Sequence, residues 1–307
     1  MTPDQHTIKE FYLDVGDGHE LYVQDWGDKA AKKPILFLHG GPGSGCKDGH
    51  KELFDPTKQH VIFHDQRASG NSKTADPLRA NTTEDLAKDI TRIADKLKID
   101  SFILVGGSWG SCLALYYALQ SPQRVTALLL RGVTTCAAEE IAWLDQGGFR
   151  ALFPEVWQKY LDATPIEHHK DPSAYHYQMA LNGPAAKAKQ SGYAYSCMEA
   201  ALLRLDDRFT PPDYELFEPE KILIEMHYMS NGCFLPDNYI LDRAQTLTMP
   251  IWIVQGRYDV ICPPFGAYNL AQKAPHANLV WTVAGHSNGD RANYDVMRSI
   301  ALTLTEA

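Results

Sequence analysis

The sequence predicts an α/β fold, built on a doubly wound, mostly parallel sheet that is interrupted by a helical insertion. Residues 1–135 alternate short apolar runs with segments of helical periodicity. Residues 136–240 contain helix-like and aromatic-rich segments with no strand pattern between them. The alternation of strand and helix patterns returns over residues 241–307. Such alternation is typical of a parallel sheet with helices on both faces.

Short apolar runs predict the central strands. The segments "KPILFLHG", "HVIFHDQR", "SFILVGG" and "VTALLLRG" are continuously apolar and end in polar or glycine-containing loops, as strands buried on both faces do. "HELYVQDWG" alternates polar and apolar residues, which favours a half-exposed strand. "TTEDLAKDITRIADKLKI" has helical periodicity and begins like a capping box. "WGSCLALYYALQSP" predicts a helix that proline ends.

The middle of the chain predicts a helical cap over one end of the sheet. Its segments are "EEIAWLDQGGFRALFPEVWQKYLDA", "PSAYHYQMAL", "SGYAYSCMEAALLRL" and "EKILIEMHYMSNGCF". After it, "MPIWIVQGRYDV" and "ANLVWTVAGHS" predict two more strands, and "FGAYNLAQKA" and "NYDVMRSIALTLT" two more helices. We therefore expect residues 1–135 and 241–307 to form one α/β domain, and residues 136–240 to form the cap.

Composition and charge exclude several classes of partner. The 307 residues carry a formal net charge of −9 and contain no block of lysine or arginine. Nucleic acids and anionic membrane surfaces attract clustered positive charge, so we expect neither as a partner. No apolar run is long enough to cross a bilayer, and no secretory signal is visible, which favours a cytoplasmic protein.

The six cysteines are scattered along the chain, without a CxxC pair or a His/Cys cluster at metal-ligand spacing. In a chain of this size without an export signal, such cysteines are expected to be free thiols rather than three disulfides. Structural zinc is not expected either. The sequence thus predicts a protein without a metal.

The stretch "VGGSWGSCLAL" places a serine at a tight corner between a predicted strand and a predicted helix. Ser108 lies in the pattern G-x-S-x-G, which Gly106 and Gly110 complete. This context matches a nucleophile elbow, where the serine has positive φ and glycines leave room for the turn. The alternative is a glycine-rich turn that carries an incidental serine.

Two later residues could activate that serine. Hydrolases with this corner use the chain order serine, acid, histidine. Asp259 follows the predicted strand "PIWIVQG", and His286 follows "LVWTVAG". Asp259 would orient His286, which would take the Ser108 proton and later protonate the leaving amine. Singly, Asp259 could be a turn aspartate and His286 a loop-capping histidine, but their order and context favour a triad.

A glycine loop follows the strand "ILFL". In "HGGPG", the backbone N–H of Gly41 could approach a developing oxyanion, and the N–H of Trp109 would be the second donor. The alternative is a phosphate-binding turn. Pro42 within the loop and the absence of G-x-G-x-x-G or a P-loop lysine argue against it.

Together, "HGGPG", "DQRASGNS", "GGSWGSCLAL", "GRYDVICP" and "GHS" resemble the proline iminopeptidases, a family of serine exopeptidases with the α/β-hydrolase fold. The likeness runs through most of the chain. It implies Ser108, Asp259 and His286 as the triad. It also implies an enzyme without metal or organic cofactor, whose substrates are small peptides with a free N-terminus. The released residue would be proline foremost.

The resemblance also implies that two cap glutamates hold the substrate's free amino group. Glu225 in "EMHYM" and Glu199 in "SCMEA" stand at those positions. Two carboxylates attract an ammonium group and disfavour a blocked N-terminus. The alternative is that both are solvated helix glutamates, as charged residues on helices usually are.

The cap departs from the family pattern. Met229 replaces an aromatic residue, and Cys197 and Met198 stand where tryptophan is expected. Methionine is flexible and accepts many shapes, so these changes bear on the preference for proline more than on catalysis. Two further departures are Asn288 in "GHSNGD" and Ala68 after "DQR".

Three other residues receive an expectation from their position in the motifs. Cys262 keeps the family position three residues after Asp259, so it lines the site or is a buried core thiol. Asp65 and Arg67 in "DQR" are expected to form a structural ion pair beneath the glycine loop.

Two other functions remain open at this point. An esterase or amidase of the same fold would act on small neutral substrates and would not need a free amine. A non-catalytic binding protein would gain nothing from an intact triad and glycine loop. The fold alone does not decide among these functions.

Overall fold

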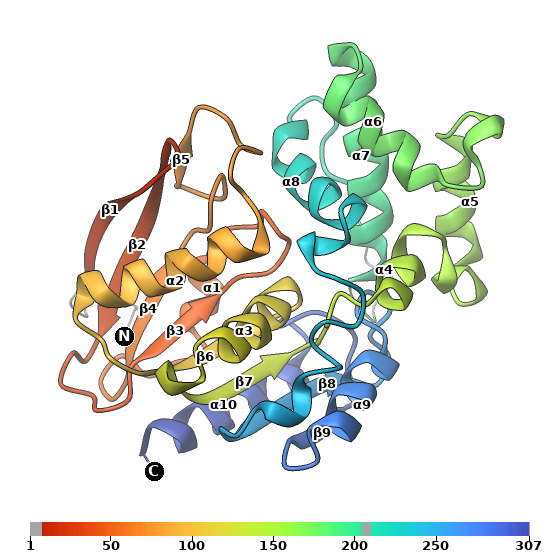
Figure 1. The fold of residues 1–307 in the computed structure, drawn as a ribbon. Coiled ribbons are helices and arrows are strands. Elements are labelled where there is room, and N and C mark those ends of the chain that lie inside the picture. The colour runs from red at the N-terminus through yellow and green to blue at the C-terminus, as the bar shows by residue number, and fades with distance from the viewer. Residues whose placement is uncertain (1–7, 204, 206–209, 307) are drawn as a thin grey trace.

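A nine-stranded sheet forms the centre of the protein in the computed structural model, which describes residues 8–203, 205 and 210–306. The strand order is β1-β2-β4-β3-β6-β7-β8-β9, with β5 beside β2 (Figure 1). The strands are β1 Ile8–Gly16, β2 His19–Gly27, β3 Ile35–Leu38, β4 His60–His64, β5 Lys73–Thr74, β6 Phe102–Gly107, β7 Val125–Arg131, β8 Ile251–Gly256 and β9 Asn278–Thr282. The predicted doubly wound sheet is confirmed.

The parallel strands are the apolar runs of the sequence. β3, β4, β6, β7, β8 and β9 pair in parallel, and every residue of β3 and β4 is buried. β1 and β2 form an antiparallel hairpin at one edge, and β2 also pairs antiparallel with β4. β1 is a half-exposed edge strand that the sequence patterns above did not single out.

Helices cover both faces of the sheet. On one face lie α2 (Thr83–Leu97), α3 (Trp109–Gln120) and α9 (Pro264–Lys273), whose apolar side chains join one buried cluster with the strands. On the other face, α10 (Arg291–Glu306) packs into a second cluster, near the short helix α1 (Asp48–Lys51). The predicted capping box of α2 is formed, because the Asp85 backbone N–H donates to Thr82 Oγ1 at 3.3 Å.

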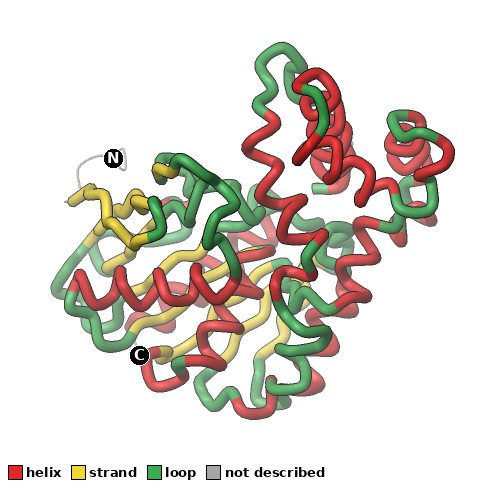
Figure 2. Tube along the Cα trace, turned by 45° about the horizontal axis from the view of Figure 1, so that its top comes forward, coloured by secondary structure: helices red, strands yellow, loops and turns green. Residues whose placement is uncertain are grey.

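In the described residues, five α-helices follow β7 and precede β8. They are α4 Ala138–Asp145, α5 Pro154–Asp162, α6 Pro172–Asn182, α7 Ala185–Leu202 and α8 Pro219–Ser230. They have a buried cluster of their own, which also includes three residues of the loop after β8. Figures 1 and 2 show these helices grouped beyond one end of the sheet. The sheet resumes at Ile251, and the cap boundaries of 136 and 240 stay a prediction.

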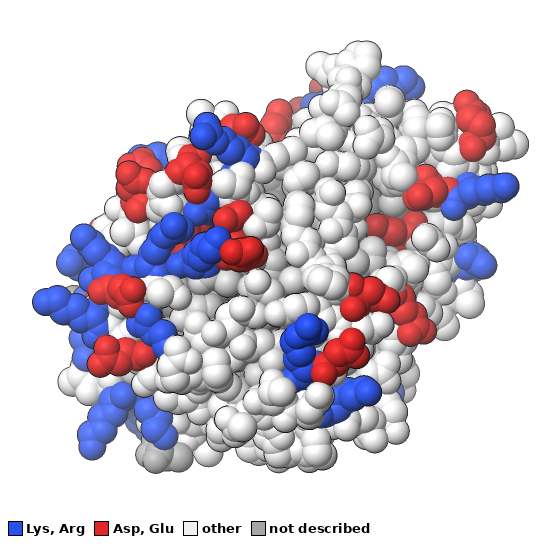
Figure 3. Space-filling model, viewed as in Figure 1, with Lys and Arg blue, Asp and Glu red and all other residues white. Residues whose placement is uncertain are grey.

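The surface in Figure 3 carries charges of both signs. Basic and acidic side chains are interspersed over α2 and its neighbours, and a broad area without charge extends up toward the cap. None of the helices in the described residues is both long and apolar enough to cross a membrane.

The corner between β6 and α3 depends on close contact between backbones. A Cβ atom at Gly110 would overlap the carbonyl oxygen of Leu38 at the end of β3. A Cβ atom at Gly106 would overlap the carbonyl oxygen of Gly110 itself. Backbone atoms in a packed core cannot move aside cheaply, so both positions require glycine. These glycines let α3 begin directly at the end of β6.

We predict that Gly110→Ala lowers the free energy of unfolding by at least about 2 kcal/mol, the usual scale of overpacking in a core. Gly49→Ala is the matched control, because a Cβ atom there has no neighbour within 4 Å. Urea denaturation of both variants and the parent measures the effect. Equal midpoints for Gly110→Ala and the parent would contradict the packing argument.

Candidate active site

Ser108 occupies a strained backbone conformation between β6 and α3, with φ 57° and ψ −130°. Its backbone N–H donates to the carbonyl oxygen of Arg131 at 2.9 Å, which ties the corner to the neighbouring strand β7. Its carbonyl oxygen accepts from the Ser111 hydroxyl at 2.6 Å. A non-glycine residue held at positive φ costs on the order of 1–3 kcal/mol and is typical of functional sites. The surrounding hydrogen bonds hold the corner in place.

Asp259 and His286 are in direct contact, and both are buried. The imidazole Nδ1 lies 2.9 and 3.0 Å from the two carboxylate oxygens of Asp259. Because these oxygens accept, Nδ1 carries the proton and Nε2 is left as the acceptor. A Cβ atom at Gly132 would lie 3.1 Å from both side chains. The absence of a side chain at Gly132 therefore leaves space for the Asp259–His286 pair.

Asp259 is held by three further donors. The backbone N–H groups of Ile261 and Cys262 donate to Oδ1 at 3.1 and 2.8 Å. The Gln255 amide donates to Oδ2 at 3.2 Å. A carboxylate that accepts this many hydrogen bonds is fixed in orientation. Asp259 therefore fixes the tautomer and the direction of His286.

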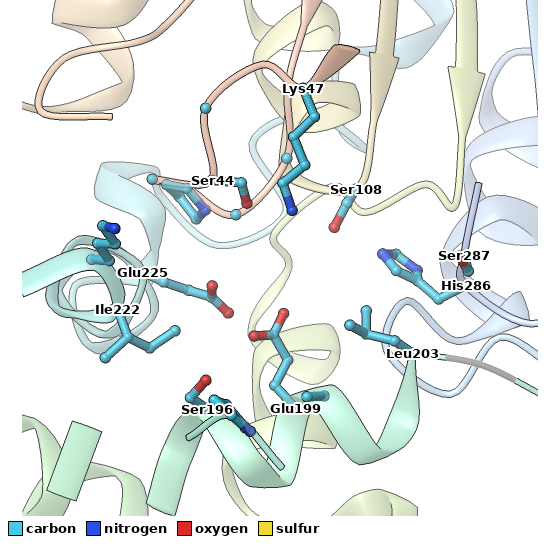
Figure 4. Close-up of a pocket in the computed structure, with 18 of the residues that line it drawn as sticks. Ser44, Lys47, Ser108, Ser196, Glu199, Leu203, Ile222, Glu225, His286 and Ser287 are labelled. Carbon is cyan, nitrogen blue, oxygen red and sulfur yellow. The ribbon is translucent and has the colours of Figure 1, made fainter. Parts of the chain in front are cut away.

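Ser108 and His286 face a common cavity of about 670 Å³ (Figure 4). Its lining comes from the glycine loop, the Ser108 corner, the loop after β9, and the cap helices α7 and α8. Ser108 stands at the end of β6, Asp259 after β8 and His286 after β9, so parallel strands present all three at one edge of the sheet. The structure brings the three residues of the predicted triad together, and their catalytic role stays a prediction.

The glycine loop lies against the serine. A Cβ atom at Gly40 would be 3.2 Å from the Ser108 Cβ atom, and Gly41, with φ 105°, lines the cavity. Trp109 is buried and follows the serine at the first turn of α3. These placements suit backbone N–H donors on both sides of a reacting carbonyl, as the sequence predicts for Gly41 and Trp109.

His39 holds the glycine loop in place. Its Nε2 accepts from the backbone N–H of Gln66 at 3.0 Å, so the proton is on Nδ1, which donates to the Gly40 carbonyl at 2.9 Å. Burial lowers the pKa of His39, which keeps the ring neutral for these two roles. The Gln66 amide also links the loop to the indole of Trp109, whose Nε1 donates to it at 2.9 Å. The sequence patterns alone did not assign this role.

Arg131 supports the loop that carries His286. Its guanidinium Nη1 donates to the His286 carbonyl oxygen, and burial lowers its pKa. It makes no ion pair with any carboxylate among the described residues. A buried arginine bonded to a backbone carbonyl acts as a rigid support, because its planar fork has few alternative arrangements.

The expected ion pair between Asp65 and Arg67 is wrong. Arg67 instead pairs with Asp89 on α2 at 2.6 Å and reaches Asp17 at 3.3 Å. Asp65 accepts from the backbone N–H groups of Cys46 and Asn71 at 2.6 and 2.7 Å. The reason is geometric: a backbone donor engages each oxygen of the Asp65 carboxylate, while the Arg67 guanidinium points toward the buried Asp89 on α2.

Glu199 on α7 and Glu225 on α8 face the same cavity as Ser108. Figure 4 shows their carboxyl groups directed toward one another. Burial raises the pKa of both, and the charge of Glu199 raises the pKa of Glu225 further. Two carboxyl groups that face each other cannot both ionise without cost, so the arrangement favours a proton shared by the pair. The alternative of two solvated helix glutamates does not fit this burial.

The other singled-out residues divide between the site and the core. The Cys262 thiol is 4.0 Å from Ser108 Oγ but is buried, and burial raises its pKa. Asn288 lines the cavity. Ala68 has φ 57°, a conformation that glycine adopts more easily.

The cap departures from the family pattern lie mostly away from the serine. Met229 does not line this cavity but a second one, of about 350 Å³, beside α4 and α6. Met198 is buried in the core of the cap, and Cys197 is half-buried. Among the described residues, no group of three or more His, Cys, Asp or Glu side chains could hold a metal ion.

The chain resembles known proteins over nearly its full length. Residues 33–289 match the alpha/beta hydrolase fold family. A proline iminopeptidase of Xylella fastidiosa is 38% identical over 304 residues, covering 97% of this chain and 95% of that protein. The chain belongs to the proline iminopeptidase family. Another member, from Arabidopsis thaliana, is 36% identical over 282 residues, or 90% of this chain and 74% of that protein.

Solved structures of other hydrolases share the fold of this chain. An esterase from Exiguobacterium antarcticum has a TM-score of 0.64 at 17% identity, covering 96% of this chain and 99% of that one. An enol-lactonase from Burkholderia xenovorans has a TM-score of 0.65 at 18% identity, covering 97% of this chain and 100% of that one. At such identities the likeness shows the α/β-hydrolase fold alone. As a member of the proline iminopeptidase family, the protein is a hydrolase.

We predict that Ser108→Ala loses at least about a thousandfold in turnover, because a nucleophile, base and acid act as a unit. The variant should also escape labelling by a serine-directed phosphonate that modifies the parent. Ser101→Ala, just before the other end of β6, is the control and should be labelled normally. Labelling of a folded Ser108→Ala protein would place the nucleophile elsewhere.

The raised pKa values of Glu199 and Glu225 predict a pH-dependent stability. Between the pKa of an unfolded glutamate, about 4.3, and the higher folded values, the folded state binds more protons than the unfolded state. This pair's contribution to stability therefore falls as pH rises through that window.

Glutamine mimics the protonated acid. We predict that the melting temperature of Glu225→Gln rises relative to that of the parent as the pH increases. The two proteins should melt at similar temperatures near pH 5, and the variant should melt at least about 3 °C higher near pH 8. Glu220→Gln, an exposed position on the same helix, is the control and should show no such divergence. A constant difference between Glu225→Gln and the parent at both pH values would contradict the buried pair.

Proposed function

We propose that the protein is a serine aminopeptidase that releases the N-terminal residue, proline foremost, from small peptides. One observation carries the proposal: the carboxyl groups of the buried Glu225 and the half-buried Glu199 face the same cavity as a serine at a strained strand-to-helix corner. Such a cavity can bind an ammonium group next to an acyl group that is to be attacked. The family relationship supports the same activity.

The chemistry begins at Ser108. His286 Nε2 removes the hydroxyl proton while the serine oxygen attacks the carbonyl carbon of the first peptide bond. The backbone N–H groups of Gly41 and Trp109 stabilise the negative charge that develops on the carbonyl oxygen. His286 then protonates the leaving amine, and the C–N bond breaks to give an acyl-enzyme. A water molecule, deprotonated by His286, hydrolyses the ester and frees Ser108.

The substrate's ammonium group binds the carboxyl pair best when both carboxyl groups are ionised. An ammonium about 4 Å from a carboxylate gains roughly 4 kcal/mol at an effective dielectric constant near 20, before desolvation is counted. Because Glu199 and Glu225 share a proton when the cavity is empty, binding of an ammonium favours loss of that proton. An acylated amine offers no charge in return and leaves the acids buried without a partner.

Apolar side chains complete the space for the first residue. Ile222 and Leu203 line the cavity, and Phe217 adds an aromatic ring to its lining. Phe217 can pack against a pyrrolidine ring, which supports the preference for proline although Cys197 and Met198 stand where tryptophan is expected.

A reducing compartment fits the same proposal. All six cysteines are free thiols, four of them buried. Free thiols persist in the cytoplasm, where disulfides are rare. We therefore propose a cytoplasmic enzyme without metal or organic cofactor.

The free amine separates this function from that of an esterase on the same fold. We predict that Glu199→Gln or Glu225→Gln lowers kcat/KM for prolyl 4-nitroanilide about a hundredfold, the effect of losing a few kcal/mol of charge pairing. Hydrolysis of 4-nitrophenyl acetate, which has no amine, should change little. The parent should not cleave the N-acetylated anilide.

The exposed Glu220 on the same helix provides the control, and Glu220→Gln should behave as the parent does with both substrates. If the parent cleaves the N-acetylated anilide as fast as prolyl 4-nitroanilide, the aminopeptidase proposal is wrong and an esterase or amidase function takes its place.

A further inference from the structure

Lys47 introduces a positive charge into the catalytic cavity. It follows the glycine loop and immediately precedes α1. Its side chain lines the cavity, and Figure 4 shows it extending into the space that Ser108 and the two glutamates face. Neither the triad nor amine binding uses this residue. A cation at this position repels the substrate's ammonium, so amine recognition alone does not explain it.

The Lys47 ammonium has no carboxylate partner among the described residues. Other lysines do have partners: Lys51 pairs with Asp48 at 2.9 Å, and Lys221, on the rim of the same cavity, pairs with Glu218. Lys47 forms no such pair in the part of the chain that the structure describes. Burial raises the pKa of Glu199, and the charges of His286 and Lys47 act against that rise, so Lys47 lies within electrostatic range of the site.

Another hollow adjoins the catalytic cavity at the residues that follow His286. It measures about 510 Å³ and shares Lys47, His50, Ser287 and Asn288 with the cavity. Its remaining lining includes Arg291, which pairs with Asp295 at 2.8 Å. Since His286 protonates the leaving amine, the part of the substrate after the scissile bond lies on this side. Lys47 stands at the junction of the two spaces.

A dipeptide carries its two charges close together. Consecutive Cα atoms are about 3.8 Å apart, so the ammonium and carboxylate of a dipeptide flank a single peptide bond. Each added residue moves the carboxylate up to about 3.5 Å farther away. A site that contacts both terminal charges of one substrate at the same time therefore selects short peptides.

We propose that Lys47 is a specificity-determining residue that binds the α-carboxylate of the leaving amino acid, so that free dipeptides are the preferred substrates. This inference rests on the aminopeptidase function proposed above. The glutamate pair holds the positive end of the zwitterion and Lys47 the negative end, with the scissile carbonyl at Ser108 between them. Longer peptides and C-terminal amides lose the second contact.

The test compares Pro-Gly with Pro-Gly amide, which differ only in the terminal charge. We expect the parent to cleave the free acid with a kcat/KM about tenfold higher than the amide, since one charge pair at a half-open site is worth roughly that factor. The ratio should shrink as salt is added, because ions screen an exposed pair.

Substitutions at Lys47 test the assignment to this residue. Lys47→Met should bring the ratio of the two kcat/KM values to about one, Lys47→Glu should invert it, and Lys47→Arg should preserve it. Lys221→Met is the matched control, because it removes a cation from the same rim that is already paired with Glu218. It should leave the ratio as in the parent.

The outcomes separate this inference from the proposed function. If the parent cleaves both substrates equally well, or if Lys47→Met keeps the preference for the free acid, the role of Lys47 is wrong and the aminopeptidase stands. If the parent cleaves neither dipeptide nor prolyl 4-nitroanilide, both proposals fall. Because each ratio is measured on one protein preparation, partial misfolding of a variant cancels.

Discussion

The backbone contact between the first turn of α3 and the end of β3 is the constraint on which the site depends. Gly106 and Gly110 have no side chains, so α3 starts directly at the end of β6 and Ser108 is held at positive φ. The corner in turn fixes where the predicted base and the predicted oxyanion loop must stand. The parallel strands place these groups there, because the loops after β3, β8 and β9 all begin at the same edge of the sheet.

The placement of the two cap glutamates opposes the stability of the folded protein. Glu199 and Glu225 come from two different cap helices and face each other in the cavity, where the loss of water raises the pKa of both. The cap core, which includes Tyr195 and Met198, holds α7 in place behind Glu199. Packing elsewhere therefore offsets the cost of the two acids, and in the proposed function they gain a partner when an ammonium binds.

The sequence predicted well what depends on local pattern, and less well what depends on distant neighbours. Continuous apolar runs identified the central strands, and chain order with loop position placed Ser108, Asp259 and His286 at one edge. The Asp65–Arg67 pair failed because the partner of a side chain at a strand end is chosen by elements far along the chain, here Asp89 on α2. The supporting role of Arg131 was invisible for the same reason, since its acceptor is a backbone carbonyl of a distant loop.

The most direct test of the account is the number of protons exchanged when an amine binds. Titration calorimetry of the Ser108→Ala protein with prolinamide, in buffers of different ionisation enthalpy near pH 6.5, measures it without turnover. If the glutamate pair holds a shared proton and gives it up to an ammonium, up to one proton is released per ligand bound, and Glu225→Gln in the same background abolishes the release. Binding without proton release, or release that persists in Glu225→Gln, would contradict the central role of the buried carboxyl pair.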